Sequence, residues 1–162
     1  MTAAVVGCVL LQFPPSMSSD RFDRRRVIFV TTLVAGAAAF AITLEPSTGW
    51  KLYALVGVFG GLSLPLYSLC IAHANDFLEP EQMVGASGGL VLASGIGAVM
   101  GPLSVSVAMS QFGPDELFHS LAVIHGLLGV FALYRMFRRQ AKPLSEQGPH
   151  MPTAAHASQV AV

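Results

Sequence analysis

The chain has 162 residues, of which 53% are hydrophobic and only 11% are charged, whereas about a quarter of the residues in a typical soluble domain are charged. A soluble fold of this length could not bury so much apolar surface. Basic and acidic residues balance at nine each, so the charge indicates no nucleic-acid partner. The composition excludes an ordinary soluble domain and predicts a protein embedded in the lipid bilayer.

Five apolar runs in chain order predict an all-α fold, a polytopic bundle of about five transmembrane helices. The first run, residues 1–15, falls short of the roughly 20 residues that cross a bilayer. It is either a weak span or the remainder of a longer helix, and we favour the second interpretation. The other four runs meet or approach the required length: 27–44, 50–74, 84–110 and 117–137.

The predicted bundle, residues 1–139, carries its basic residues on one side. Only Lys51 lies on the opposite side, and the others fall in the first connection or after the last span: Arg21, Arg24, Arg25, Arg26, Arg135, Arg138, Arg139 and Lys142. Because basic residues accumulate in cytoplasmic loops, we expect an outside N-terminus and a cytoplasmic C-terminus. Residues 140–162 are polar and rich in proline and alanine, which predicts a disordered cytoplasmic tail.

The connection before the second run is the strongest local signal. Its arginines fit a simple anchor at the membrane surface, but Asp20 and Asp23 alternate with them. Anchoring does not require carboxylates, so these two indicate specific partners, either arginine side chains or a helix N-terminus. From the residues alone both interpretations remain open.

This connection resembles the loop signature of the major facilitator superfamily (MFS), in which an Asp-Arg pair precedes further basic residues. The residues that carry the resemblance are Gln12-Phe13-Pro14, Ser19-Asp20-Arg21, Asp23-Arg24-Arg25, Pro65-Leu66-Tyr67-Ser68, His73-Ala74-Asn75-Asp76 and the stretch from Gly95 to Pro102. It covers about residues 1–140 and follows the order seen in a bacterial inner-membrane subgroup. Ser16 and Ser18 depart from the glycine and the apolar residue usual in this loop.

The resemblance implies helices eight to twelve of a twelve-helix transporter, whose two halves rock to expose a cavity to each side of the membrane in turn. It implies that the missing N-terminal half is a partner, and that Asp20 caps a helix of that half. The conformational-switch loop would comprise Asp20, Arg21, Asp23, Arg24 and Arg25.

Polar residues on the helices supply further candidates. By resemblance to the eighth and tenth helices, Gln12, Tyr67 and Ser68 border the central cavity and are candidate substrate contacts. Helix packing is an equally good use of them.

Candidates for gating or proton movement are His73, Asn75, Asp76 and His125. The first three lie at a cytoplasmic helix end, where they form either a local cap or a gating contact. His125 lies in the last span and is either a neutral, hydrogen-bonded packing residue or a titrating group.

Gly97 and Gly101 form a GxxxG step that is followed by Pro102. Such a step permits close helix packing and a bend. The sequence does not separate static packing from a helix that flexes during transport.

Two classes of function compete. The first is transport of a small solute by an incomplete permease, and the second is a membrane interaction protein or inactive transporter remnant. The spans contain no HExxH motif, Cys-His pair or carboxylate dyad, so we expect neither an enzyme nor a bound metal or cofactor. The polarity of the spans favours no class of substrate.

Overall fold

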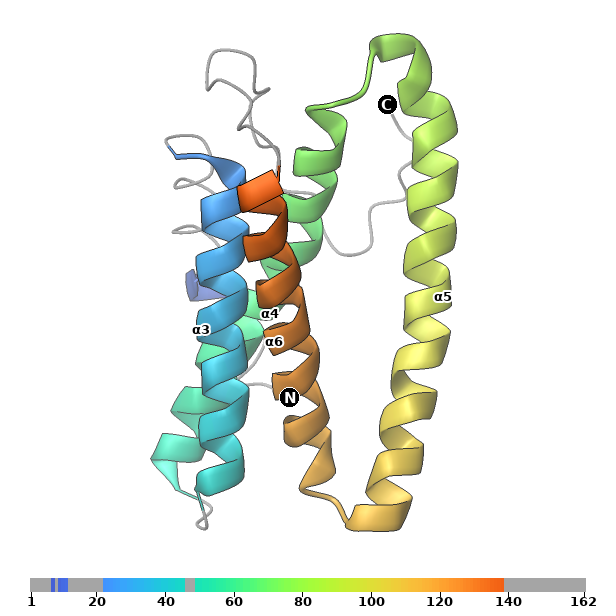
Figure 1. The fold of residues 1–162 in the computed structure, drawn as a ribbon. Helices are drawn as coiled ribbons and strands as arrows, with labels where there is room; N and C mark the ends of the chain where they lie inside the picture. Colours follow the sequence, from blue (N-terminus) through green and yellow to red (C-terminus); the bar gives the residue numbers. More distant parts are fainter. Residues whose placement is uncertain (1–6, 8, 12–21, 46–48, 139–162) are drawn as a thin grey trace.

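The computed structural model describes residues 7, 9–11, 22–45 and 49–138. Four long helices make up most of this part: α3 (Arg24–Leu44), α4 (Trp50–Asn75), α5 (Pro80–Phe112) and α6 (Glu116–Arg138). They run up and down beside one another (Figure 1), and each is long and apolar enough to cross a membrane. The predicted polytopic helical bundle is confirmed.

The helices extend beyond the predicted apolar runs because polar residues cap them. Asp23 precedes α3, and its carboxylate accepts a hydrogen bond from the backbone N–H of Arg25 over 3.0 Å. Arg24 and Arg25, expected in a connecting loop, therefore lie in the first helical turn, which corrects that expectation. At the start of α5, Glu79 and Gln82 form a capping box, which satisfies backbone donors that a helix start leaves open.

Helix α3 lies at the centre of the bundle and packs against both α4 and α6. Its packed face is made of small residues, with Ala35 and Ala39 fully buried and Thr32 and Gly36 also buried. A Cβ atom at Gly36 would lie 3.1 Å from the Cβ of His125 on α6. Small residues allow such close approach, and dispersion contacts then hold membrane helices together.

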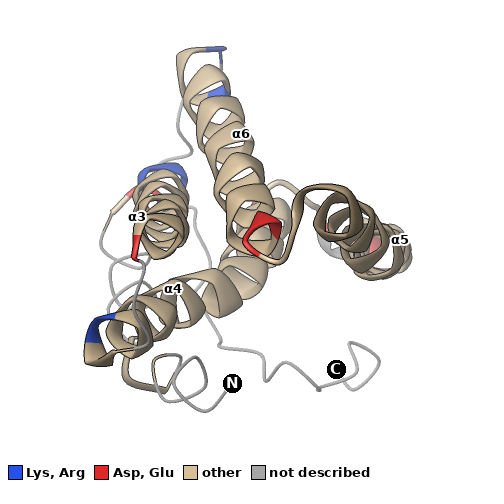
Figure 2. Cartoon of the chain, turned by 90° about the horizontal axis from the view of Figure 1, so that it is seen from below, with Lys and Arg blue, Asp and Glu red and all other residues tan. Residues whose placement is uncertain are grey.

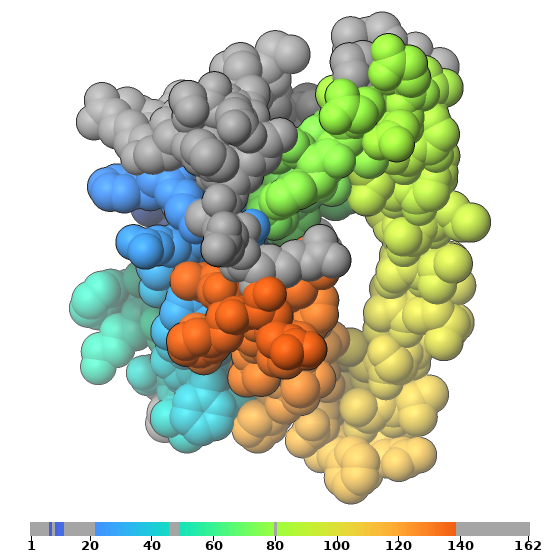
Figure 3. Space-filling view, turned by 45° about the horizontal axis from the view of Figure 1, so that its top comes forward, coloured from blue at the N-terminus to red at the C-terminus, as the bar shows by residue number. Residues whose placement is uncertain are grey.

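Helix α5 stands apart from this core and contacts chiefly α6 (Figures 1 and 2). Only 6% of its most apolar stretch is buried, against 39% for α3, and the space-filling view shows an open gap beside it (Figure 3). Four serine hydroxyls of α5 donate to carbonyls of their own helix: Ser87, Ser94, Ser104 and Ser110. This helix satisfies those polar groups internally, as a lipid environment requires.

A close glycine contact joins the N-terminal region to α4. Residues 7 and 9–11 are helical, and a Cβ atom at Gly61 would lie 2.5 Å from the carbonyl oxygen of Gly7. The two backbones can approach this closely only because neither residue has a side chain. The rest of the predicted first span and the predicted tail, 140–162, lie outside the described residues.

Candidate functional site: the basic end of the bundle

A buried ion pair joins the start of α3 to the end of α4. A guanidinium nitrogen (Nη1) of Arg24 lies 2.7 Å from Oδ1 of Asp76, and the two side chains are only 3% and 4% exposed. The same nitrogen donates to the carbonyl oxygen of Ala72 over 3.2 Å. Charge-assisted hydrogen bonds of this length are strong when water is excluded, so this pair fixes the two helix ends to each other.

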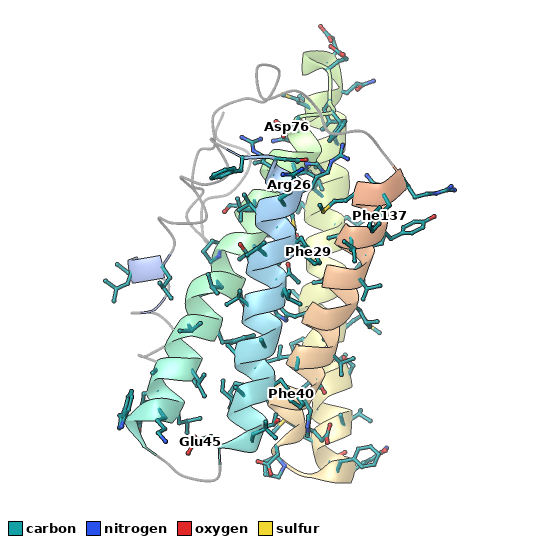
Figure 4. The ribbon with its side chains drawn as sticks, turned by 60° about the vertical axis from the view of Figure 1, so that its left-hand side comes forward. Arg26, Phe29, Phe40, Glu45, Asp76 and Phe137 are labelled. Carbon is teal, nitrogen blue, oxygen red and sulfur yellow. The ribbon has the colours of Figure 1, made fainter. Side chains whose placement is uncertain are left out.

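Further charged and aromatic side chains surround this pair. Arg25 stacks over the ring of Phe77 with its guanidinium carbon 5.9 Å from the ring centre, and His73 meets the same ring edge-on at 5.2 Å. Figure 4 shows Arg26, Asp76 and Phe137 at this end of the bundle, with Glu45 at the other. The start of α3 and the ends of α4 and α6 thus form one basic end.

The structure brings together residues that the sequence had placed in two separate groups. Arg24 and Arg25 belong to the predicted switch loop, whereas His73 and Asp76 belong to the predicted gating group, and here they form one cluster. Asn75 lies beside the cluster and is exposed. The remaining residues of the predicted loop, Asp20 and Arg21, lie outside the described residues, as does Gln12.

The other substrate-contact candidates lie on α4, below the cluster. Tyr67 is 45% exposed, while the hydroxyl of Ser68 donates to the carbonyl oxygen of Pro65 over 2.8 Å. That local bond engages the Ser68 hydroxyl within its own helix. Tyr67 is the more accessible of the two to a solute.

His125 lies between three helices in the middle of the core. Its Nδ1 is 2.8 Å from the carbonyl oxygen of Leu121, and its Nε2 is 3.1 Å from the hydroxyl of Ser63. A carbonyl can only accept, so Nδ1 carries the proton and, in the neutral ring, Nε2 accepts from Ser63. Phe59 packs edge-on against the ring at 5.4 Å. This is the geometry of a hydrogen-bonded packing histidine.

The glycines of α5 face open space among the described residues. A Cβ atom added at Gly97 or Gly101 would meet no atom within 4 Å, and α5 continues as a helix through Pro102. The predicted packing role of these three residues stays a prediction, and any partner must come from outside the described residues.

The sequence reasoning missed two residues that shape this core, Ser63 and Gly36. Ser63 carries no local signal in the sequence, because its bond to His125 crosses 62 positions. Gly36 is a single glycine among alanines, and only the position of His125 on α6 shows why a small residue is needed there.

The family follows from comparison with known proteins. A sequence model of the Major Facilitator Superfamily matches residues 1–159. The chain belongs to this superfamily. Membership agrees with the four apolar helices and confirms the resemblance inferred from the loop and helix motifs.

Curated relatives in the superfamily are longer than this chain. It is 25% identical over 126 residues to YfkF of Bacillus subtilis (strain 168), an uncharacterized MFS-type transporter, and the match covers 76% of this chain and 31% of YfkF. It is also 25% identical over 145 residues to YcaD of Escherichia coli (strain K12 / DH10B), another uncharacterized MFS-type transporter. This match covers 90% of this chain and 37% of YcaD. The chain thus spans about a third of the length of these relatives. No solved structure matches it.

Proposed function

We propose that this chain is part of a secondary transporter that moves a small solute across the membrane by alternating access. Superfamily membership supports transport in general. The observation that carries the specific proposal is the buried Arg24–Asp76 pair. It joins the helix start that follows the signature loop to the neighbouring helix end.

The ion pair gives the loop a mechanical role in this proposal. Rocking transporters move each bundle as a largely rigid body, which requires that a loop meeting the other half be fixed to its own half. Arg24 and Asp76 supply that fixed point, and the Asp23 cap orders the first turn beside it. Asp20 and Arg21 would then contact the other half in one state of the cycle and release it in the other.

We propose that the rest of the transporter is supplied by another segment or chain. The match to about a third of each relative's length and the unburied α5 with its open glycines support this arrangement. The excess of arginine at one end supports a cytoplasmic location for that end and an outside location for the N-terminus. The membrane in this proposal is the bacterial inner membrane. Gln12, Tyr67 and Ser68 are the proposed solute contacts.

A transport assay with matched variants tests the proposal. The chain is expressed alone and together with any N-terminal half encoded upstream, and uptake and efflux of a panel of labelled solutes are followed with and without a proton gradient. We expect transport only in the combined sample, and we expect it to fall steeply with Asp76→Asn. Arg26→Gln is the control, because Arg26 is exposed at the same helix start.

The competing function is a membrane interaction protein or inactive remnant without transport activity, which the partial coverage of the relatives favours. Absence of transport in both samples, with the protein correctly inserted in the membrane, would support this competing function. Transport by the chain alone would show that no other half is needed and would overturn the proposed arrangement.

A further inference from the structure

Three consecutive arginines at the start of α3 have three different environments. Arg24 is buried and pairs with Asp76. Arg25 is also buried, at 7% exposed, and its guanidinium lies over the ring of Phe77. Arg26 is exposed. Successive residues of an α-helix point about 100° apart, so two of the three arginines face the neighbouring helix end and the third points away from it.

The end of α4 receives these two arginines with two consecutive residues. Asp76 accepts a hydrogen bond from Arg24 over 2.7 Å. The next residue, Phe77, places its ring beside Arg25, with the guanidinium carbon 5.9 Å from the ring centre. Within about 6 Å the face of an aromatic ring attracts a cation. Two adjacent side chains of α3 thus contact two adjacent side chains at the end of α4.

The ring of Phe77 is held in its position by the end of its own helix. Its backbone N–H donates to the carbonyl oxygen of Ala74 over 3.2 Å, so the chain continues to turn beyond α4. His73, four residues earlier, meets the ring edge-on, with the ring centres 5.2 Å apart and the planes at 86°. Phe77 is 48% exposed, so the packing of a core does not account for this arrangement.

The second contact supplies a constraint that the ion pair alone lacks. One ion pair fixes the distance between two helix ends but lets the first turn of α3 pivot about the line that joins the charged atoms. The first turn of a helix makes fewer backbone hydrogen bonds than its interior, so its direction depends on side-chain contacts. A contact by the adjacent residue prevents the pivoting and sets the direction in which the chain enters α3 through Asp23.

We propose that Phe77 is a positioning residue that, together with Asp76, holds the start of α3 in one orientation and so directs the signature loop. Its importance for transport rests on the proposed function, in which Asp20 and Arg21 of that loop meet the other half. The orientation itself can be measured on this chain alone. Failure of this proposal is therefore distinguishable from failure of the proposed function.

The chain offers a matched set of variants for the test. Phe77→Leu removes the ring and keeps an apolar side chain, whereas Phe77→Tyr keeps the aromatic face. Phe137→Leu is the control, because Phe137 is 82% exposed and lies on α6 at the same end of the bundle (Figure 4).

Double electron–electron resonance on the full chain measures the orientation. Spin labels are attached at Phe22→Cys, directly before Asp23, and at Leu127→Cys on α6, both at exposed positions, in a chain whose Cys8 and Cys70 are replaced by alanine. We expect Phe77→Leu to raise the population of a displaced position of the first label about two- to fivefold, the factor that a partly exposed cation–π contact supplies. Phe77→Tyr and Phe137→Leu should match the reference chain.

A double variant assigns the effect to the contact with Arg25. In an Arg25→Gln background the ring has no guanidinium to hold, so Phe77→Leu should cause no further displacement. An unchanged distance distribution in Phe77→Leu, equal displacement in Phe77→Tyr or Phe137→Leu, or a full further effect in the Arg25→Gln background would overturn the proposal.

A measurement on the unaltered chain avoids any dependence on the folding of a variant. The guanidinium signal of Arg25 in nuclear magnetic resonance spectra should be shifted by the ring current of Phe77. Arg135 and Arg138 provide internal references, because each lies over an aromatic ring at the same 5.9 Å. An Arg25 signal at the position of exposed arginine would refute the contact.

Transport by the chain combined with an N-terminal half gives the functional arm. Phe77→Leu should lower the transport rate about two- to fivefold, and Phe77→Tyr should restore it. An unchanged rate in Phe77→Leu would refute the role of Phe77 in directing the loop. Absence of transport in every sample counts against the proposed function alone, and the distance distributions then decide this proposal.

Discussion

The buried pair of Arg24 and Asp76 allows a sharp test of how the bundle is held together. Both side chains are almost fully removed from solvent, at 3% and 4% exposed, and the charged atoms are 2.7 Å apart. Removing one partner breaks this charge contact between two buried side chains, and breaking a buried pair in this way costs about 3–5 kcal/mol. We expect Asp76→Asn and Arg24→Gln each to lower the free energy of unfolding by about this amount.

The double variant makes the prediction specific to the ion pair. Arg24→Gln with Asp76→Asn removes both charges and lets two amides pair, so the double variant should be more stable than the sum of the single effects indicates, by about 1–3 kcal/mol.

These values come from equilibrium unfolding in mixed detergent micelles, followed by circular dichroism. Arg26→Gln is the control, because Arg26 is exposed in the same helical turn and such surface changes usually stay within about 0.5 kcal/mol. Strictly additive single and double variants, or single variants as mild as the control, would refute the reasoning.

Two further predictions use the same unfolding assay. Gly61→Ala should destabilise the protein by about 1–3 kcal/mol, because its Cβ would lie 2.5 Å from the Gly7 carbonyl oxygen. Gly95→Ala is the control, because an added Cβ at Gly95 would meet no atom within 4 Å. It should leave stability unchanged or raise it slightly, since alanine favours helix. Equal losses of stability at both positions would contradict the described packing. Ser63→Ala removes the partner of His125 Nε2 and should cost about 1–3 kcal/mol, and a neutral result would mean that this bond is not formed in the membrane.

The helices could be predicted from the sequence because membrane helices are marked by long uncharged runs. The runs 27–44 and 117–137 lie within α3 and α6, which the structure extends to Arg24–Leu44 and Glu116–Arg138. The boundaries differ because a helix continues into charged turns once a cap such as Asp23 is available. Hydropathy identifies the residues that lie in the hydrocarbon layer, whereas capping hydrogen bonds determine where a helix begins and ends.

The candidate site was predicted residue by residue, but its pairing was not. The sequence indicates both Arg24 and Asp76 as candidate site residues. Because 52 positions separate them, no sequence motif contains both or shows that they meet. Their contact depends on how the end of α4 lies against the start of α3, and this follows from the packing of the two whole helices. A single sequence shows each of these features but not the crossing of the helices that combines them.

The exposure of α5 has a different meaning from exposure in a soluble protein. Lipid tails are as apolar as leucine, so exposed residues such as Leu92 or Val99 create no drive to be covered. Glycine is the informative residue, because it lowers helix propensity and contributes no side chain to lipid contact. Gly97 and Gly101 therefore lower helix propensity without gaining a close contact among the described residues, and a helix packed closely on that face would supply such a contact. On this reasoning Gly97→Leu should leave the isolated chain folded and weaken its association with an N-terminal half.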